Sequence, residues 1–134
     1  MKLSTGCRYG IRAMLEIAHQ HGKQPVTRRE IACRQSISLS YLENILLLLK
    51  KSNLITSVRG ARGGFSLARA PGEIDLFEIF KVLEGPLEPV NCLVNPISCE
   101  RVSQCVTRTV WQQLYVANKK ILRNTTIQDL LDRE

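Results

Sequence analysis

The chain has 134 residues, which is enough for one domain, or for one domain with a dimerisation element. It carries 19 Lys and Arg against 12 Asp and Glu, a net charge of +7. Hydrophobic residues at 44% argue against a disordered chain, and aromatic residues at 5% argue against modules that stack single-stranded bases on aromatic rings. No apolar run approaches the ~18 residues of a membrane span. The first residues do not resemble a signal segment, so we expect a cytoplasmic protein without a membrane partner.

The positive charge is concentrated in the first half of the chain. Residues 1–70 contain 12 basic and 3 acidic side chains, a net of +9, whereas residues 71–134 contain 7 and 9, a net of −2. A basic module of this kind indicates an anionic partner, most commonly nucleic acid. A solvated basic surface without a partner is the alternative.

The first half is predicted to begin with three helices. The first is expected over residues 4–21. A Thr-x-x-Glu capping box opens a second helix over residues 27–35, and a Ser-x-x-Glu box opens a third over residues 40–52. Two capped helices joined by a short serine-rich turn predict a helix-turn-helix.

A β-hairpin is predicted after the third helix. Residues 54–58 and 65–68 are typical of short strands, and the segment between them places Arg59 and Arg62 among three glycines. A helix, a helix-turn-helix and a hairpin wing, in this order, predict a winged-helix domain over residues 1–70. The expected fold is therefore mainly α with a small β-hairpin wing.

The second half is predicted to connect this domain to a dimerisation helix. Residues 71–98 hold a helix over 76–84 and a proline-containing loop without regular structure. Residues 99–134 hold a long helix over 100–123, roughly 36 Å in length, and a short C-terminal helix. A monomer cannot easily cover such a long helix, so we expect it to pair with a second copy. Its apolar stripe consists of Val106, Val110, Leu114, Ala117 and Ile121.

The helix-turn-helix and the wing supply candidate contacts to double-stranded DNA. The N-terminal turns of a recognition helix face base edges in the major groove, and arginines on a wing can enter the minor groove or contact phosphates. Two of the helix candidates have a purely structural alternative, because the capping box by itself would explain Ser40 and Glu43 without any contact to DNA. Tyr41 could contact phosphate or only pack. The candidates are Arg28, Ser38, Ser40, Tyr41, Glu43, Asn44, Lys50, Arg59 and Arg62, with Lys2, Arg8, Arg12, Arg29 and Lys51 as further phosphate contacts.

Three cysteines form a candidate metal site. Cys92, Cys99 and Cys105 have the spacing C-x6-C-x5-C, and thiolates are soft ligands for an iron–sulfur cluster, zinc or copper(I). Thiol sensing and an inert role are the alternatives. The chain has no Cys-x-x-Cys pair, which disfavours a zinc ribbon. Cys33, on the second helix, is expected in the core.

Together these motifs resemble a known family. Residues 1–10, 34–43 and 58–65 and the three cysteines are similar to the IscR-type iron–sulfur cluster regulators, whose relatives include NsrR-like and CymR-like sensors. The resemblance implies a bacterial, homodimeric transcription factor, a repressor that binds a pseudo-palindromic operator. It also implies a [2Fe-2S] or, alternatively, a [4Fe-4S] cluster on the three cysteines, loaded by the iron–sulfur assembly machinery.

The sequence departs from this family at one ligand position. The IscR prototype has a histidine ligand three residues after the last cysteine, where this chain has Arg108, and a guanidinium cannot bind a metal. Related sensors use a side chain on the partner subunit's first helix, so Cys7 of the partner is a candidate fourth ligand. A small buried residue at Cys7, with water, a small thiol or a carboxylate as the ligand, is the alternative.

Two other functions compete with a cluster-sensing regulator. The first is a cluster-free regulator of cysteine metabolism that acts with a partner enzyme. The second is an iron–sulfur carrier or scaffold, which has no need for a wing or a basic half. An enzyme is not expected, because the chain has two histidines, both on the first helix, and no nucleophile–base motif.

Overall fold

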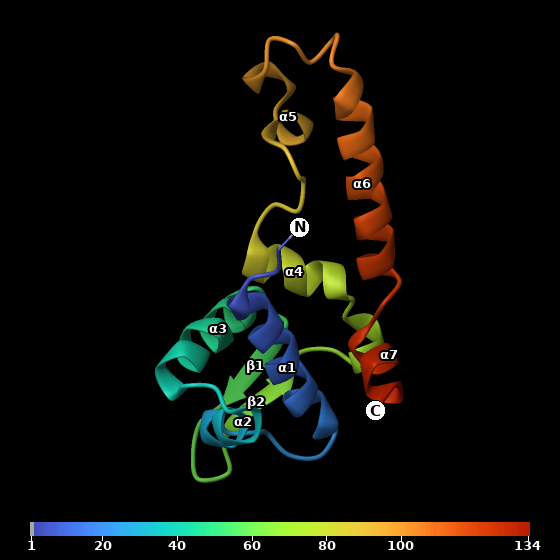
Figure 1. Ribbon diagram of the computed structural model, residues 1–134. Coiled ribbons are helices and arrows are strands. Elements are labelled where there is room, and N and C mark those ends of the chain that lie inside the picture. The colour runs from blue at the N-terminus through green and yellow to red at the C-terminus, as the bar shows by residue number, and fades with distance from the viewer. Residues whose placement is uncertain (1) are drawn as a thin grey trace.

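The computed structural model describes residues 2–134. Helices and one hairpin form a body from which a long helix rises, and the loop before that helix lies at the end of the molecule furthest from the hairpin tip (Figure 1). The elements are α1 (Thr5–His19), α2 (Arg28–Gln35), α3 (Leu39–Lys51), β1 (Ile55–Val58), β2 (Gly64–Leu67), η1 (Pro71–Glu73), α4 (Leu76–Glu84), α5 (Asn91–Val94), η2 (Pro96–Ser98), α6 (Val106–Arg123) and α7 (Ile127–Asp132).

Among the first three helices, the starts follow the sequence with one correction, at α3. The predicted capping box at α2 is present, because the Thr27 hydroxyl accepts from Glu30 N at 3.2 Å and the Glu30 carboxylate accepts from Thr27 N at 2.7 Å. The predicted box at Ser40 is wrong, since α3 begins earlier and Ser38 is its cap. The chain turns at Ser36, whose φ is 53°, and buries Ile37, which brings Ser38 to the helix start.

The hairpin is antiparallel, as predicted, and is anchored at its base. Ile55 pairs with Leu67, and both are buried. At the other end Gly64 has a φ of +148°, and a Cβ there would lie 2.6 Å from the carbonyl oxygen of Val26. Only glycine therefore lets the hairpin lie so close to the segment before α2.

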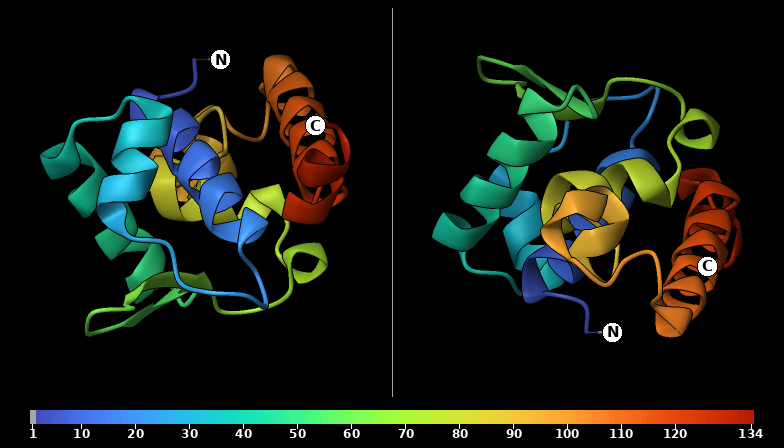
Figure 2. Two further views of the ribbon diagram at one scale, coloured as in Figure 1. Left: turned by 90° about the horizontal axis from the view of Figure 1, so that it is seen from below. Right: turned by 90° about the horizontal axis from the view of Figure 1, so that it is seen from above.

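The apolar core joins both ends of the chain. It contains Met14 of α1 and Leu46 of α3, and also Ile79 of α4 and Ile127 of α7, all 2% exposed or less. The backbone of α7 is attached as well, because Ile127 N donates to Ile74 O at 3.0 Å. The packed body therefore continues beyond residue 70. It leaves α6 and α7 on one side and α3 and the hairpin on the other (Figure 2).

Three sequence expectations are corrected outside the core. The long helix begins at Val106 rather than at residue 100, because 100–104 form turns and Cys105 is at the cap. The loop after α4 contains two short helical segments, α5 and η2. Cys33 is exposed, because α2 buries only the side that carries Ile31, and a residue two positions later faces away from it.

The apolar stripe of α6 has no cover within the described chain. Val106, Val110, Leu114 and Ile121 are 81%, 52%, 42% and 64% exposed. The opposite side of the helix packs on α4 and α5. Among residues 2–134, no helix has both the length and the apolar character needed to cross a membrane.

Candidate nucleic-acid interface and cysteine segment

Every predicted DNA contact lies on the surface. Helix α3 buries Leu42, Ile45, Leu46 and Leu49 against the body and therefore turns its remaining positions outward. The exposed set consists of Arg28, Ser38, Ser40, Tyr41, Glu43, Asn44, Lys50, Arg59 and Arg62. The amphipathic pattern of α3 thus decides which side chains are available to a partner.

Four of these residues line one hollow. Arg28 of α2 and Glu43, Asn44 and Lys50 of α3 surround a groove of about 330 Å³, whose other wall includes Phe65 of the hairpin. The Arg28 guanidinium and the Glu43 carboxylate form an ion pair of 2.8 Å across it. The fold therefore brings the start of α2, the outer face of α3 and the paired strand residues Ser57 and Phe65 of the hairpin together.

Sequence reasoning missed an exposed leucine of this groove. Leu47 lines it and is 50% exposed, although leucine at this position of the apolar run could have been read as core. The available signal was spacing, because Leu47 lies three residues after Asn44 on the polar face. An exposed apolar side chain beside polar ones can contact the methyl group of thymine.

Two of the predicted DNA contacts also contact other side chains of the same protein. The Tyr41 ring meets the Tyr9 ring edge-on, with centroids 5.8 Å apart, so it packs on α1 while 39% of the residue stays exposed. Arg12 donates to the Gln35 side chain at 2.7 Å and lies over the Tyr9 ring. Arg12 therefore joins α1 to the end of α2 and is the least free of the proposed phosphate contacts.

The wing tip is free of such contacts. Arg59 and Arg62 are exposed on a turn in which Gly63 N donates to Gly60 O at 3.0 Å, and Gly60 has a φ of +113°. Neither arginine has an ion-pair partner within residues 2–134. Both guanidinium groups are therefore available to bind an anionic partner.

The three cysteines of the second half occupy one segment but are not gathered. Cys92 lies on α5, Cys99 follows η2, and Cys105 caps α6; all three are half-buried free thiols. In the part of the chain that the structure describes, no three His, Cys, Asp or Glu side chains are close enough to hold a metal ion. For the three thiols to bind one metal centre, residues 92–105 would have to move and bring them closer together.

Two features of this segment suit an anionic or metal-bound group. The pKa of Cys105 is lowered by hydrogen bonds from the Thr107 hydroxyl, 3.2 Å away, and from the backbone of Arg108, and a lower pKa favours the thiolate that ligates metals. Arg108 donates to Cys92 O at 3.4 Å, but its Nε is buried with no hydrogen-bond partner among the described residues. An unsatisfied charged donor of this kind favours an anion nearby.

Cys7 lies in a different environment. It is fully buried within its own chain, and burial together with the Glu84 carboxylate raises the pKa of its thiol to about 12. A protonated, enclosed thiol matches the alternative of a small buried residue. This placement gives no support to Cys7 as a ligand for a partner subunit.

The sequence matches the model of the Rrf2 family, described as an iron-dependent transcriptional regulator, over residues 3–133. It is 40% identical over 131 residues to Protein rrf2 of Nitratidesulfovibrio vulgaris, covering 98% of this chain and 87% of that protein. It is 37% identical over 130 residues to the HTH-type transcriptional regulator CymR of Bacillus subtilis, covering 97% and 89%. It is 35% identical over 134 residues to the HTH-type transcriptional regulator IscR of Sodalis glossinidius, covering 100% and 81%.

Solved structures agree with these relatives. The structure of CymR, the global cysteine regulator of B. subtilis, has a TM-score of 0.84 at 36% identity, and the match covers 100% of this chain and 98% of that one. The T. potens IscR structure has a TM-score of 0.81 at 37% identity and covers 100% and 89%. The expected mainly helical fold with a hairpin wing, and the resemblance to IscR-type and CymR-type regulators, are confirmed.

Proposed function

Because the chain belongs to the Rrf2 family of transcriptional regulators, we propose that it is a cytoplasmic, dimeric repressor that binds a pseudo-palindromic operator through α3 and the wing. As a member of that family it is a regulator and not an enzyme. One observation supports the proposed interface: residues of α2, α3 and the hairpin line one groove, and the unpaired Arg59 and Arg62 are exposed on the same hairpin.

On this surface α3 reads the major groove. Asn44 offers the paired donor and acceptor that suit adenine, and Leu47 offers an apolar contact for a thymine methyl. The ion pair of Arg28 and Glu43 is exposed to solvent and therefore contributes little stability. Arg28 can move to a phosphate, which leaves Glu43 to accept a hydrogen bond from a cytosine amino group. Arg59 and Arg62 enter the adjacent minor groove or hold its phosphates.

The dimer forms along α6. The exposed stripe of Val106, Val110, Leu114, Ala117 and Ile121 presents an apolar surface that a second copy would remove from water. Two copies place two α3 helices on one side of the DNA, and half-sites of such dimers are about 34–36 Å apart. A change near the start of α6 would therefore alter operator affinity through this spacing.

The donor chemistry of residues 92–105 fits an iron–sulfur cluster. Cys92, Cys99 and Cys105 would hold it, Cys105 has a lowered pKa, and the buried Nε of Arg108 supplies a positive donor beside Cys92. When bound, a cluster supplies an anionic group that responds to iron, nitric oxide or redox status. We propose [2Fe-2S] first and [4Fe-4S] second, with a fourth ligand from outside these three residues.

A cluster-free regulator that acts with a partner enzyme is the second candidate. It is favoured by the likeness to the global cysteine regulator of B. subtilis, whose structure has a TM-score of 0.84. Anaerobic purification followed by visible absorption and iron analysis separates the two. A coloured protein with iron that is lost in Cys92→Ala supports the cluster, and a colourless, iron-free wild type refutes it.

Operator binding is the decisive test of the function itself. Fragments selected from random duplex DNA would be titrated with wild type, Asn44→Ala and a matched Asn118→Ala variant. Asn118 lies on α6, away from the proposed interface. We expect Asn44→Ala to weaken specific binding by about tenfold or more, since one bidentate base contact contributes ~1–3 kcal/mol of discrimination. Equal specific binding by all three proteins would refute base reading by α3.

A further inference from the structure

A basic cleft separates α6 from α4. It has a volume of about 480 Å³ and lies on the side of α6 opposite to the apolar stripe, bounded by α4, the loop after it and α6. Tyr115, Lys119 and Arg123 recur every four residues along α6 and so share the face that lines it. The cleft is therefore separate from the DNA-facing groove and from the proposed dimer surface.

Three cations converge on one aromatic ring in this cleft. Lys81 Nζ lies 5.7 Å, Lys119 Nζ 5.4 Å and Arg123 Cζ 4.3 Å from the centroid of the Phe77 ring. Each contact is favourable alone, since the face of the ring attracts a cation. Three like charges around one ring nevertheless repel each other, and a bound anion would relieve that repulsion.

The acidic groups nearby leave two of the cations unpaired. Asp75 pairs with Arg123 at 3.1 Å. Lys81 and Lys119 have no carboxylate within 4.0 Å among the described residues. Glu88 is the acidic residue of the lining, and it lies beside Tyr115, whose pKa is raised by burial and, to a smaller extent, by the Glu88 carboxylate. Two ammonium groups thus face the cleft with no negative partner.

The rest of the lining is apolar. Pro86, Leu87 and Val94 complete the wall, and the volume lies within the ~300–1,000 Å³ of small-molecule sites. We propose that this cleft binds a small organic anion, whose phosphate or carboxylate head lies between Lys81 and Lys119 and whose aromatic or aliphatic body lies against Leu87 and Val94. No cysteine lines the cleft, although Val94 lies on α5, the short helix that also carries Cys92.

Calorimetric titration of the full-length protein tests the site. The probes are phenyl phosphate, benzoate, inorganic phosphate and benzyl alcohol. We expect one site per chain for phenyl phosphate or benzoate, with much weaker binding of inorganic phosphate and of the neutral alcohol. The two acids distinguish a phosphate head from a carboxylate head. Equal affinity for inorganic phosphate and phenyl phosphate would mean an adventitious ion only and would overturn the proposal.

Matched variants locate the binding. Lys81→Gln with Lys119→Gln removes both unpaired ammonium groups, and we expect affinity to fall at least tenfold. Lys120→Gln removes the same kind of charge from the next position of α6, which does not line the cleft, and should leave affinity unchanged. Equal losses in both proteins would indicate general charge attraction and would overturn the site. Failure of the wild type to bind either acid would overturn it as well.

A measurement on the wild type alone guards against a misfolded variant. Amide chemical shifts recorded during titration with the tighter acid should change first at Lys81, Leu87 and Lys119. Changes centred on α3 or on the hairpin would show that the anion occupies the DNA-facing surface instead, and the proposal would be wrong.

Discussion

Two arginines, one at the tip of the hairpin and one after its second strand, are predicted to have different roles. Arg59 is at the tip, exposed and without an ion-pair partner in residues 2–134, whereas Arg69 follows the second strand and is held by the body. Replacing each with alanine should separate DNA binding from folding. Arg59→Ala should weaken DNA binding without changing the free energy of unfolding, and Arg69→Ala should do the reverse.

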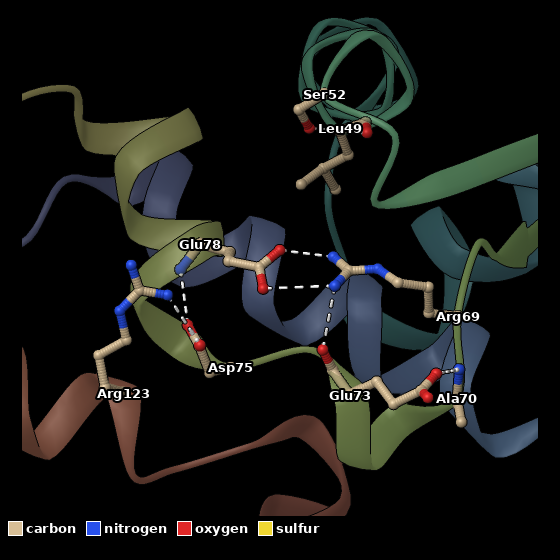
Figure 3. A network of polar contacts seen from close by, with 8 residues as sticks. All are labelled: Leu49, Ser52, Arg69, Ala70, Glu73, Asp75, Glu78 and Arg123. Carbon is tan, nitrogen blue, oxygen red and sulfur yellow. Dashed lines mark hydrogen bonds and ion pairs between the residues drawn. The ribbon is translucent and has the colours of Figure 1, made fainter.

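The size of the Arg69 effect follows from its contacts. Its guanidinium bonds both oxygens of Glu78, at 2.5 and 3.4 Å, and donates to Glu73 O at 3.1 Å (Figure 3). Hydrogen bonds to charged groups contribute ~1.5–3 kcal/mol when buried, but the Arg69 side chain is 40% exposed and solvent screens it. We therefore expect Arg69→Ala to lower the free energy of unfolding by about 1–2 kcal/mol.

The same contacts connect the wing to α6. Glu78 N donates to Asp75 at 2.9 Å, and Asp75 accepts from Arg123 of α6 at 3.1 Å. Figure 3 shows these residues between the end of the hairpin, the start of α4 and the end of α6. Arg69→Ala and Arg123→Ala should consequently be non-additive, because both remove support from the start of α4.

The assay compares both variants under identical conditions. Urea unfolding at one protein concentration gives the free energy, and anisotropy on a selected operator at several salt concentrations gives affinity. Arg59→Ala should lower the slope of log affinity against log salt by about one phosphate contact. Unchanged stability in Arg69→Ala, or an unchanged salt slope in Arg59→Ala, would refute the assignment of the two roles.

Three further predictions concern the core, the buried thiol and the dimer. Ile127→Ala should cost about 2–5 kcal/mol in urea unfolding, because the side chain is fully buried in the body; a loss below 1 kcal/mol would mean that α7 is not docked there. The pKa of Cys7 is raised from 9.0 to about 12 in the folded protein, so its contribution to stability is complete below pH 9 and is lost as the pH rises toward 12. Cys7→Ala should reduce that alkaline loss, and Cys33→Ala, at an exposed site, should not. Leu114→Glu should give monomers in sedimentation velocity, whereas Val116→Glu, also exposed but off the stripe, should remain dimeric; monomeric behaviour of both would argue against the stripe.

The local features of this chain were readable from its sequence. The capping box at Thr27, the glycines of the hairpin and the three- and four-residue spacings of apolar side chains in α3 and α6 each act over a few residues, so the elements could be placed without knowledge of the fold. The start of α3 was misplaced by two residues. Ser38 and Ser40 are equally good caps by type, and only the left-handed turn at Ser36 decides between them.

The candidate DNA surface was predicted in part. Charge and helix-turn-helix order indicated the residues, but not that Arg28 and Glu43 would form a pair across a groove. Leu47 was missed for a similar reason, because an exposed leucine in an apolar run looks like a core residue until the opposite side of α3 is seen to be packed.

Sequence by itself thus determined the family, the order of elements and the separation of a basic half from a mildly acidic half, since each depends on residue type and short-range spacing. Tertiary structure alone decided which distant residues meet. It buries Cys7 beside Glu84, docks α7 into the N-terminal body and draws Lys81, Lys119 and Arg123 around Phe77. The physical reason is packing: burial and charge proximity depend on contacts between segments far apart in the chain, and no local pattern encodes them.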